Sequence, residues 1–257
     1  MDFTLAKYKE LLVALKWAGY ASLTFSDYMK GERPGKFVIL RHDVDKLPCN
    51  SLQVARIESE SGIKAVYYFR MEPCSWNEDI VREIASLGHE VGYHYENMDK
   101  CGGDVSSAYG DFKSNLEKMR AVADISTICM HGSPRSKYDN RDLWKYYSYR
   151  DLGIIGEPYL DTDFSEVLYL SDTGRRWDGF KVSVRDKIEV FQAEWQKKGW
   201  VFHTTDDIIK GLKSCKLPDK MMLTTHPQRW NEFGGRYIKE LLLQKAKNAV
   251  KFFMVKH

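Results

Sequence analysis

The sequence predicts an α/β fold in which one domain, residues 1–257, contains a parallel sheet covered by helices on both faces. Three observations predict this fold. Short apolar runs rich in aromatic and β-branched residues indicate buried strands. Each run is followed by a segment whose apolar residues have helical spacing, and this alternation repeats six or seven times. So many units in one domain of this length indicate a barrel, closed or incomplete.

The sequence of residues 1–20 predicts an amphipathic helix that packs against the rest of the domain, because its apolar residues have helical spacing. These apolar residues are Leu5, Tyr8, Leu11, Leu12 and Leu15. The chain then alternates clearly between the two kinds of segment. Predicted strands cover residues 36–43, 64–71, 90–96 and 126–133, and predicted helices cover 51–61, 76–88 and 105–123. Glycines at the ends of the first two helices support these boundaries.

The pattern is weaker between residues 134 and 165, where we expect mostly loop and a short helix near 141–149. Beyond this segment, strands are predicted at residues 166–172, 200–204 and 220–226. The polar residues of TTDDIIKGL predict a capped helix start. Residues 237–253 predict a long closing helix.

Composition and charge argue against several classes of function. The formal net charge is +3 and no basic block stands out, so nucleic acid is not expected as the main partner. No apolar run is long enough to span a bilayer, and charged residues interrupt the N-terminal segment where a signal peptide would be apolar. The five cysteines are scattered without a CxxC pair. We therefore expect reduced thiols and a cytoplasmic location.

Residues that can bind a metal or transfer a proton stand where predicted strands end. They are Asp43, Asp45, His94, Glu96, His131, Asp172 and His226. In parallel α/β folds the carboxyl ends of the strands share one rim, and this rim carries the active site. We therefore expect these residues, which are far apart in the sequence, to converge.

The stretch RHDVDK carries two carboxylates one residue apart at the end of a strand. Strand alternation puts Asp43 and Asp45 on one face and Val44 on the other. Two carboxylates so close repel each other unless a cation or a proton compensates. A metal would bind one as a ligand and leave the other able to accept a proton. The alternative is that the pair caps the helix that begins after Pro48.

Histidines complete this set, and each has a structural alternative. His94 offers an imidazole, which divalent metals accept together with carboxylates. His131 is either a further ligand or a residue that ties down the loop after its strand. His226 is either a general acid or structural. His89 precedes its strand, so a surface or hydrogen-bonding role is expected for it.

The segment YLSDTGRRWDG, residues 169–179, follows a predicted strand and combines charged and aromatic side chains. Asp172, Arg175 and Trp177 suit sugar binding, because aromatic rings stack on sugar faces and charged groups bind hydroxyls. The alternative is an ordinary polar turn.

Taken in order, HDVD, GHEVGYHYENM and LTTHP resemble motifs of the polysaccharide deacetylase superfamily, carbohydrate esterase family four. The resemblance extends over most of the chain. It implies that Asp43 is the catalytic base, that Asp45 and His94 bind a metal, and that His226 protonates the leaving group. It also implies a deformed (β/α)7-type barrel.

Two positions depart from the family pattern. Met98 stands where the family has its second metal histidine, and a thioether is a poor ligand for a hard divalent ion. The third ligand is therefore open between His131 and Glu96. The family arginine that orients the base has only a loose match, Arg135, in HGSPRSKYDN. Glu96 and Arg135 are also candidates for substrate binding.

The resemblance implies a hydrolase that uses a divalent metal, with zinc expected, to remove N-acetyl groups from a carbohydrate. The carbohydrate would belong to a bacterial surface polysaccharide or its precursor. One alternative is a metal-poor, carbohydrate-binding relative without activity, which Met98 favours. Another is a metal hydrolase acting on a different bond, such as a phosphoester. Asp43 and His226 favour catalysis over binding alone.

Overall fold

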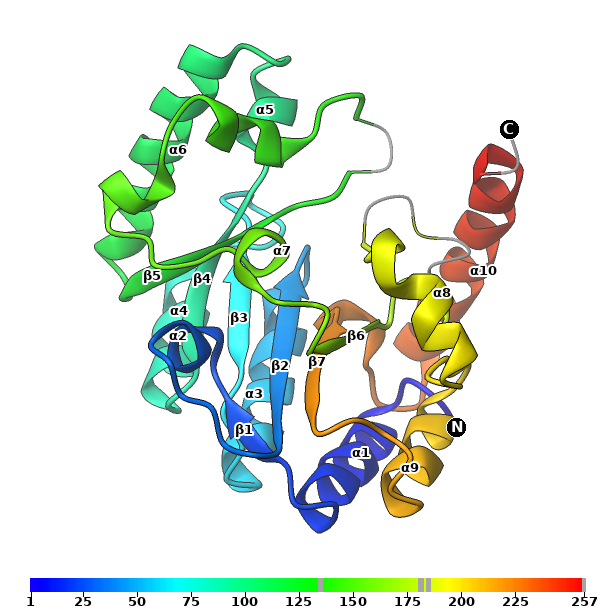
Figure 1. The fold of residues 1–257 in the computed structure, drawn as a ribbon. Helices are drawn as coiled ribbons and strands as arrows, with labels where there is room; N and C mark the ends of the chain where they lie inside the picture. The colour runs from blue at the N-terminus through cyan, green and yellow to red at the C-terminus, as the bar shows by residue number, and fades with distance from the viewer. Residues whose placement is uncertain (134–135, 180–182, 184–185, 256–257) are drawn as a thin grey trace.

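A parallel sheet of seven strands forms the centre of the protein (Figure 1). The computed structural model describes residues 1–133, 136–179, 183 and 186–255. The strand order is β5-β4-β3-β2-β7-β6, with β1 also paired to β2. The strands are β1 (Ala21–Leu23), β2 (Phe37–Val44), β3 (Val66–Phe69), β4 (Glu90–Tyr95), β5 (Ile125–Met130), β6 (Leu168–Ser171) and β7 (Lys220–Thr225).

Helices surround this sheet. The α-helices are α1 (Leu5–Trp17), α2 (Phe25–Met29), α3 (Pro48–Glu60), α4 (Glu78–Ser86), α5 (Asn97–Lys100), α6 (Val105–Arg120), α7 (Pro158–Asp161), α8 (Glu189–Lys197), α9 (Thr205–Lys213) and α10 (Gly235–Val255). Short 3₁₀ helices are η1 (Asn140–Lys145), η2 (Tyr149–Leu152) and η4 (Pro227–Arg229). Helices α1 and α9 pack against each other, and so do α3 and α4 (Figure 1).

Strand β2 is the central element, and all of its residues are buried. Its Phe37–His42 segment pairs with β7 on one side. On the other side β1 pairs with Phe37–Ile39 and β3 pairs with Arg41–Val44. An apolar strand flanked on both edges is what the run KFVIL predicts. The polar end of β2 therefore emerges between β3 and β7.

The α/β architecture with a parallel sheet confirms the fold class expected from the sequence. Strands β5 and β6 lie at the two ends of the sheet, and no ladder joins them within the ranges that the structure describes. Closure into a (β/α)7-type barrel therefore stays a prediction. Within those same ranges, no helix is both long and apolar enough to cross a membrane.

Most of the predicted elements are present. The apolar residues expected to face the body from the N-terminal helix are all buried. Helix α3 begins at Pro48, three residues before its predicted start. The weak helical signal near residues 141–149 corresponds to η1 and η2. The closing helix extends slightly beyond its predicted bounds, as α10.

The strand predicted at residues 200–204 was wrong. This apolar run connects α8 to α9, and Thr204 is the N-cap of α9 in a capping box with Asp207. Phe202 is buried without pairing into the sheet. Apolar residues indicate burial, but burial against helices satisfies them as well as burial in a sheet does. The seventh strand is instead β1, which is too short to give a periodic signal.

Candidate metal centre

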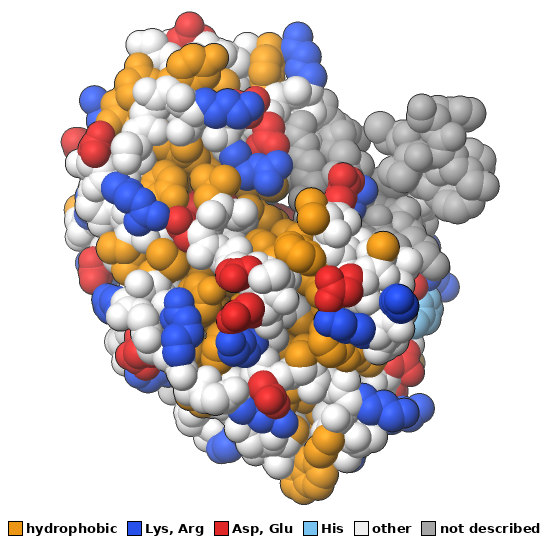
Figure 2. Space-filling model, viewed as in Figure 1, with side chains coloured by type: hydrophobic (Ala, Val, Ile, Leu, Met, Phe, Trp, Pro, Cys, Tyr) orange, Lys and Arg blue, Asp and Glu red, His pale blue; other side chains and the backbone are white. Residues whose placement is uncertain are grey.

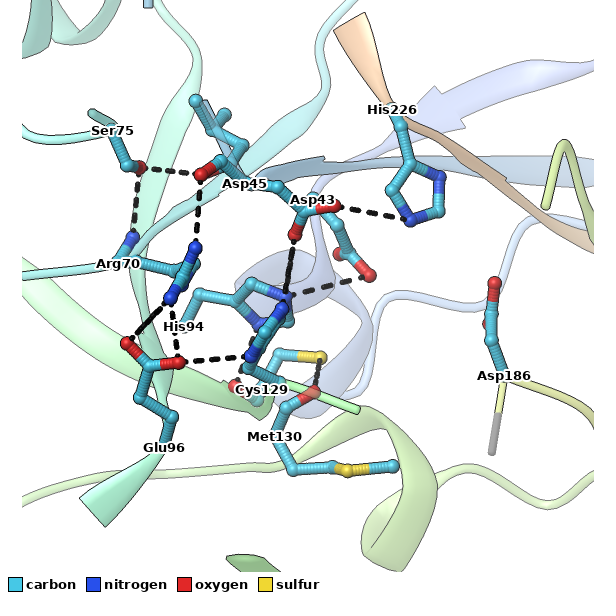
Figure 3. Close-up of polar contacts among 12 residues, drawn as sticks. Asp43, Asp45, Arg70, Ser75, His94, Glu96, Cys129, Met130, Asp186 and His226 are labelled. Carbon is cyan, nitrogen blue, oxygen red and sulfur yellow. Dashed lines mark hydrogen bonds and ion pairs between the residues drawn. The ribbon is translucent and has the colours of Figure 1, made fainter. Parts of the chain in front are cut away.

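The carboxyl ends of the central strands bring the candidate residues together (Figure 3). Asp43 belongs to β2, and Asp45 follows the end of this strand. His94 belongs to β4, whereas His131 and His226 come directly after β5 and β7. Residues from opposite ends of the chain therefore meet at one rim of the sheet, as the strand order requires.

Asp45, His94 and His131 could hold a metal ion, because one ligand atom of each lies within 4.8 Å of the others. Asp45 Oδ1 is 3.7 Å from His94 Nε2 and 3.6 Å from His131 Nε2. These distances are too long for good hydrogen bonds. They are close to the ~3.3 Å expected between two ligands of a tetrahedral zinc ion. The three residues, called the metal triad below, thus surround a point where an ion fits.

His94 is oriented as a ligand. Its Nδ1 lies 2.9 Å from the backbone carbonyl oxygen of Cys129, which can only accept a hydrogen bond, so Nδ1 carries the proton. The lone pair of Nε2 therefore faces Asp43 and Asp45. Burial lowers the pKa of His94 to about 4, so the ring is neutral at pH 7. A neutral imidazole fixed through its other nitrogen is the form that binds metals.

His131 lies against Glu96. The Nδ1 atom of His131 lies 3.0 Å from Glu96 Oε2, so its Nε2 is the atom that faces Asp45. Arg70 pairs with the same carboxylate at 2.8 Å. Burial opposes ionisation of Glu96, but His131 and Arg70 lower its pKa to about 2. The geometry therefore favours His131 as the third ligand and Glu96 as the carboxylate behind it.

A second group, Asp43, His94 and Cys129, also places its ligand atoms within 4.8 Å of one another. Metals bind the thiolate form of cysteine, and burial raises the pKa of the Cys129 thiol. The carboxylate of Asp43 is already bound by Arg41. The metal triad is therefore the better site.

Asp43 forms a pair with Arg41 from the same strand. The guanidinium donates two hydrogen bonds to the carboxylate, at 2.9 and 2.6 Å, and neither side chain is appreciably exposed. This forked contact gives the carboxylate one orientation. The sequence analysis missed Arg41, although strand alternation places it on the face of Asp43. Arg135, the loose match to a base-orienting arginine, lies outside the described residues.

Asp45 does not cap α3, so the capping alternative was wrong. The N-cap of α3 is Leu47, where no side chain accepts a hydrogen bond. Gln228 instead donates to Asp45 Oδ2 at 3.0 Å. Burial alone would raise the pKa of Asp45. The effect of His226 and of the two histidines of the metal triad is larger and opposite, so the pKa of Asp45 is below its usual range. Asp45 is therefore an ionised ligand.

His226 is held by Asp172, which is fully buried. His226 Nδ1 lies 2.6 Å from Asp172 Oδ1, and Trp230 donates to Oδ2 of the same carboxylate at 2.9 Å. The Nε2 of His226 faces Asp45 Oδ2 at 3.9 Å. Burial and Arg229 oppose protonation of His226, yet Asp172 raises its pKa above the usual value. Asp172, expected to bind sugar, is thus placed to orient the imidazole.

Arg175 and Trp177 are engaged within the protein. Arg175 pairs with Glu240 at 2.7 Å, and Trp177 Nε1 donates to the hydroxyl of Thr205 at 2.9 Å. The two side chains are 9% and 3% exposed. They fasten their loop to α10 and α9, and contact of either with a substrate stays a prediction.

Asp186 is a further buried carboxylate that the sequence analysis missed. It accepts hydrogen bonds from the hydroxyls of Tyr159, Tyr169, Ser171 and Thr173. The Tyr159 hydroxyl also accepts a hydrogen bond from Arg41 at 3.1 Å, which links Asp186 to the partner of Asp43. Asp186 stands apart from the metal triad in Figure 3. No motif or periodic pattern in the sequence marks this position.

Two residues of the GHEVGYHYENM segment lie away from the metal triad's ligand atoms. His89 bonds through Nε2 to the carbonyl of Ala55 and accepts at Nδ1 from the amide of Ala65, which confirms its hydrogen-bonding role. Met98 is buried in α5, the short helix that begins directly after Glu96. The metal triad instead includes His131, which comes directly after β5.

The rim thus gathers a possible ion site, a carboxylate held by an arginine and an imidazole held by a carboxylate. Comparison of the chain with models of known protein families and with curated proteins finds no match. The chemistry of this rim is therefore the basis for assigning a function.

Proposed function

We propose that the protein is a metal-dependent hydrolase that removes N-acetyl groups from a sugar of a bacterial surface polysaccharide or its precursor. The observation that carries this proposal is the metal triad, with Asp43 3.9 Å from His94 and His226 3.9 Å from Asp45. Amide hydrolysis needs a base for the attacking water, an electrophile at the carbonyl and an acid for the departing amine. This rim offers one group for each task.

The donor set suits zinc. Two imidazole nitrogens and one carboxylate would leave a coordination position open, as in catalytic zinc sites. A divalent ion held by Asp45, His94 and His131 would supply Lewis-acid activation of the carbonyl and of water. Glu96 and the Cys129 carbonyl orient the two imidazoles from behind.

Asp43 acts as the general base. Its carboxylate takes a proton from the water that attacks the acetamide carbonyl, and a C–O bond forms. Arg41 fixes this carboxylate in one orientation through two hydrogen bonds. Because the pair is buried, the base is positioned before the substrate binds.

His226 acts as the general acid. Its Nδ1 is bound to Asp172, so Nε2 is the atom that faces the centre. The raised pKa of His226 favours the protonated form of the ring. That proton passes to the sugar nitrogen as the C–N bond breaks, which yields acetate and a free amine.

We also propose that the chain belongs to the polysaccharide deacetylase superfamily, with the deformed (β/α)7-type barrel and the cytoplasmic location that its sequence implies. The strand order and the positions of Asp43, Asp45, His94 and His226 support this membership. In this interpretation, His131 supplies the ligand that the family places at the position of Met98. Arg41 takes the place of the family's base-orienting arginine.

The proposal is tested by measuring metal content and acetate release on the purified full chain. N-acetylated sugar oligomers serve as substrates. We expect about one divalent ion per chain, and loss of both the ion and the activity in His94→Ala. The matched control is His203→Ala, because His203 is exposed and pairs with Asp178 instead of with a member of the metal triad. It should retain both properties.

Two other results would replace the proposal. Phosphate release from a phosphomonoester without acetate release would show a metal hydrolase acting on another bond. A metal-free protein that binds N-acetylated oligomers without cleaving them would identify a carbohydrate-binding relative.

A further inference from the structure

Helix α10 is attached to the body by its polar side. Tyr237 donates a hydrogen bond to the backbone carbonyl of Asp2 at 2.9 Å. Glu240 forms an ion pair with Arg175 at 2.7 Å. One and two turns further on, Gln244 is buried and Asn248 donates to the carbonyl of Gly174 at 2.8 Å.

The opposite side of α10 is apolar and exposed. Ile238 and Leu242 are 47% and 61% exposed, and Ala246 and Ala249 continue the same stripe at helical spacing. Leu243, 50% exposed, lies beside it. A surface helix of a globular protein normally turns its apolar stripe inward. Helix α10 does the reverse, so its outer side is suited to contact with something apolar.

Basic residues flank this apolar stripe. Arg236, Lys239, Lys245 and Lys247 are all exposed. Between residues 235 and 249 the sequence has one acidic residue, Glu240, and it is turned inward to Arg175. On the face drawn in Figure 2, by contrast, positive and negative side chains are interspersed. The outer side of α10 therefore combines apolar contact area with unbalanced positive charge.

We propose that α10 is an interfacial helix that lies on an anionic lipid bilayer. Apolar side chains flanked by lysines are the pattern of helices that bind in the plane of a membrane surface. The charge complementarity favours this partner over a second copy of the chain, because helix pairing across the stripe would bring two sets of lysines together. This inference goes beyond the proposed hydrolase and does not depend on it.

The test is flotation of the full-length protein with lipid vesicles. We expect binding to phosphatidylcholine mixed with phosphatidylglycerol, weakening as salt is added, and little binding to phosphatidylcholine alone. Ile238→Gln together with Leu242→Gln should lower the partition coefficient about tenfold or more, because about half of each side chain is still exposed and would be buried in the bilayer. The matched control is Val13→Gln with Trp17→Gln, an even more exposed apolar pair at the same spacing on α1. It should bind like the parent protein.

Charge variants test whether the basic residues of α10 contribute to binding. Lys239→Ser with Lys245→Ser should lower partitioning about thirtyfold, because each basic residue near an anionic surface contributes about fivefold. Lys197→Ser, on exposed α8, is the control and should have no effect.

Three results would overturn the inference. They are equal binding to neutral and anionic vesicles, unchanged binding of the α10 variants, and absence of binding. In the last case, a dimer in sedimentation velocity that the Ile238 and Leu242 substitutions dissociate would assign the stripe to a second copy of the chain.

Discussion

Two clusters of acidic and imidazole side chains lie on opposite faces of β2. One is the metal triad of Asp45, His94 and His131. The other, called the rear cluster here, surrounds Glu58 of α3 and includes Tyr8, His42, Tyr67 and His89. His42 and Asp43 are neighbours in the chain, and strand alternation sends them to different faces. The two clusters are similar in composition but differ in how their polar atoms are spaced.

In the rear cluster the hydrogen-bond partners of Glu58 lie at contact distance, whereas His89 is 3.8 Å from Glu58 and bonds to backbone atoms of Ala55 and Ala65 instead. His42 Nε2 is 2.8 Å from Glu58 Oε1, and the hydroxyls of Tyr8 and Tyr67 donate to the same carboxylate. The other ring nitrogen of His42 lies 2.6 Å from the hydroxyl of Thr225. In the metal triad the corresponding separations are 3.6 and 3.7 Å, and the lone pairs face a common point.

This difference separates a structural cluster from a candidate ion site. A buried carboxylate whose acceptor positions are filled stabilises the fold and has no position left for a ligand. Carboxylate and imidazole atoms held just beyond hydrogen-bond distance leave room for an ion between them. Residue type alone does not make this distinction, because both clusters contain histidines and an acid.

The largest expected effect is on catalysis, in Asp43→Asn. Loss of the base should lower kcat for acetate release about 10²–10⁴-fold. The bound metal should remain, because the metal triad does not include Asp43. The control is Asp219→Asn, because Asp219 is exposed and lies directly before β7, at the amino ends of the strands. An Asp43→Asn protein with normal kcat would remove Asp43 from the mechanism.

The next effect is on stability, in Glu58→Gln. His42 and two tyrosines would lose their charged partner, which should reduce the free energy of unfolding by about 3 kcal/mol or more. Urea unfolding of the metal-free protein measures this, with exposed Glu60→Gln on the same helix as control. Metal content of the folded variant should be normal. Loss of metal with unchanged stability would reverse the roles of the two clusters.

A smaller effect is expected in Glu96→Gln. The amide would orient His131 less well, so metal affinity should fall about 10–100-fold, measured by competition with a chelator. Glu117→Gln, exposed on α6, should bind metal like the parent protein. If Glu96→Gln instead abolished binding completely, Glu96 would be a ligand itself.

The smallest expected effect is the pH dependence of stability that Glu58 of the rear cluster causes. Burial raises the pKa of Glu58, but His42 and the Tyr67 hydroxyl lower it below its usual value of 4.5. A carboxylate with a lowered folded-state pKa stabilises the protein above pH 4.5, and this contribution disappears as the pH falls. The stability advantage of the parent over Glu58→Gln should therefore shrink by about 1 kcal/mol near pH ~4. An advantage that grows on acidification would contradict this.

Much of the architecture could be predicted from the sequence, because buried strands and amphipathic helices leave periodic signals. Residues 36–43 and 220–226 were such strands, and they form neighbouring strands of the sheet. Residues 200–204 gave the same signal but pack among helices, since local hydrophobicity does not specify which partner covers a segment.

Some residues of the candidate site could likewise be predicted from the sequence, and others could not. Asp43 and Asp45 stand out because two adjacent acids at a strand end require compensation. Arg41 could have been identified in the same way, because it lies two residues before Asp43 and strand alternation places both side chains on the same face of β2. Asp186 was not, because its partners come from separate segments and only the folded chain brings them together. The choice between His131 and Glu96 likewise needed coordinates.

The pairing of Arg41 with Asp43 inside one strand has a consequence for how this rim can change. The acid and its counter-charge are carried by a continuous piece of backbone, so no loop is needed to bring the two groups together. Segments above the rim that do not carry Tyr159 can be lengthened, shortened or exchanged without removing a hydrogen-bond partner of Arg41. Under the proposed function, the protein is therefore a scaffold on which substrate choice could be redesigned by grafting loops while Asp43 stays in place.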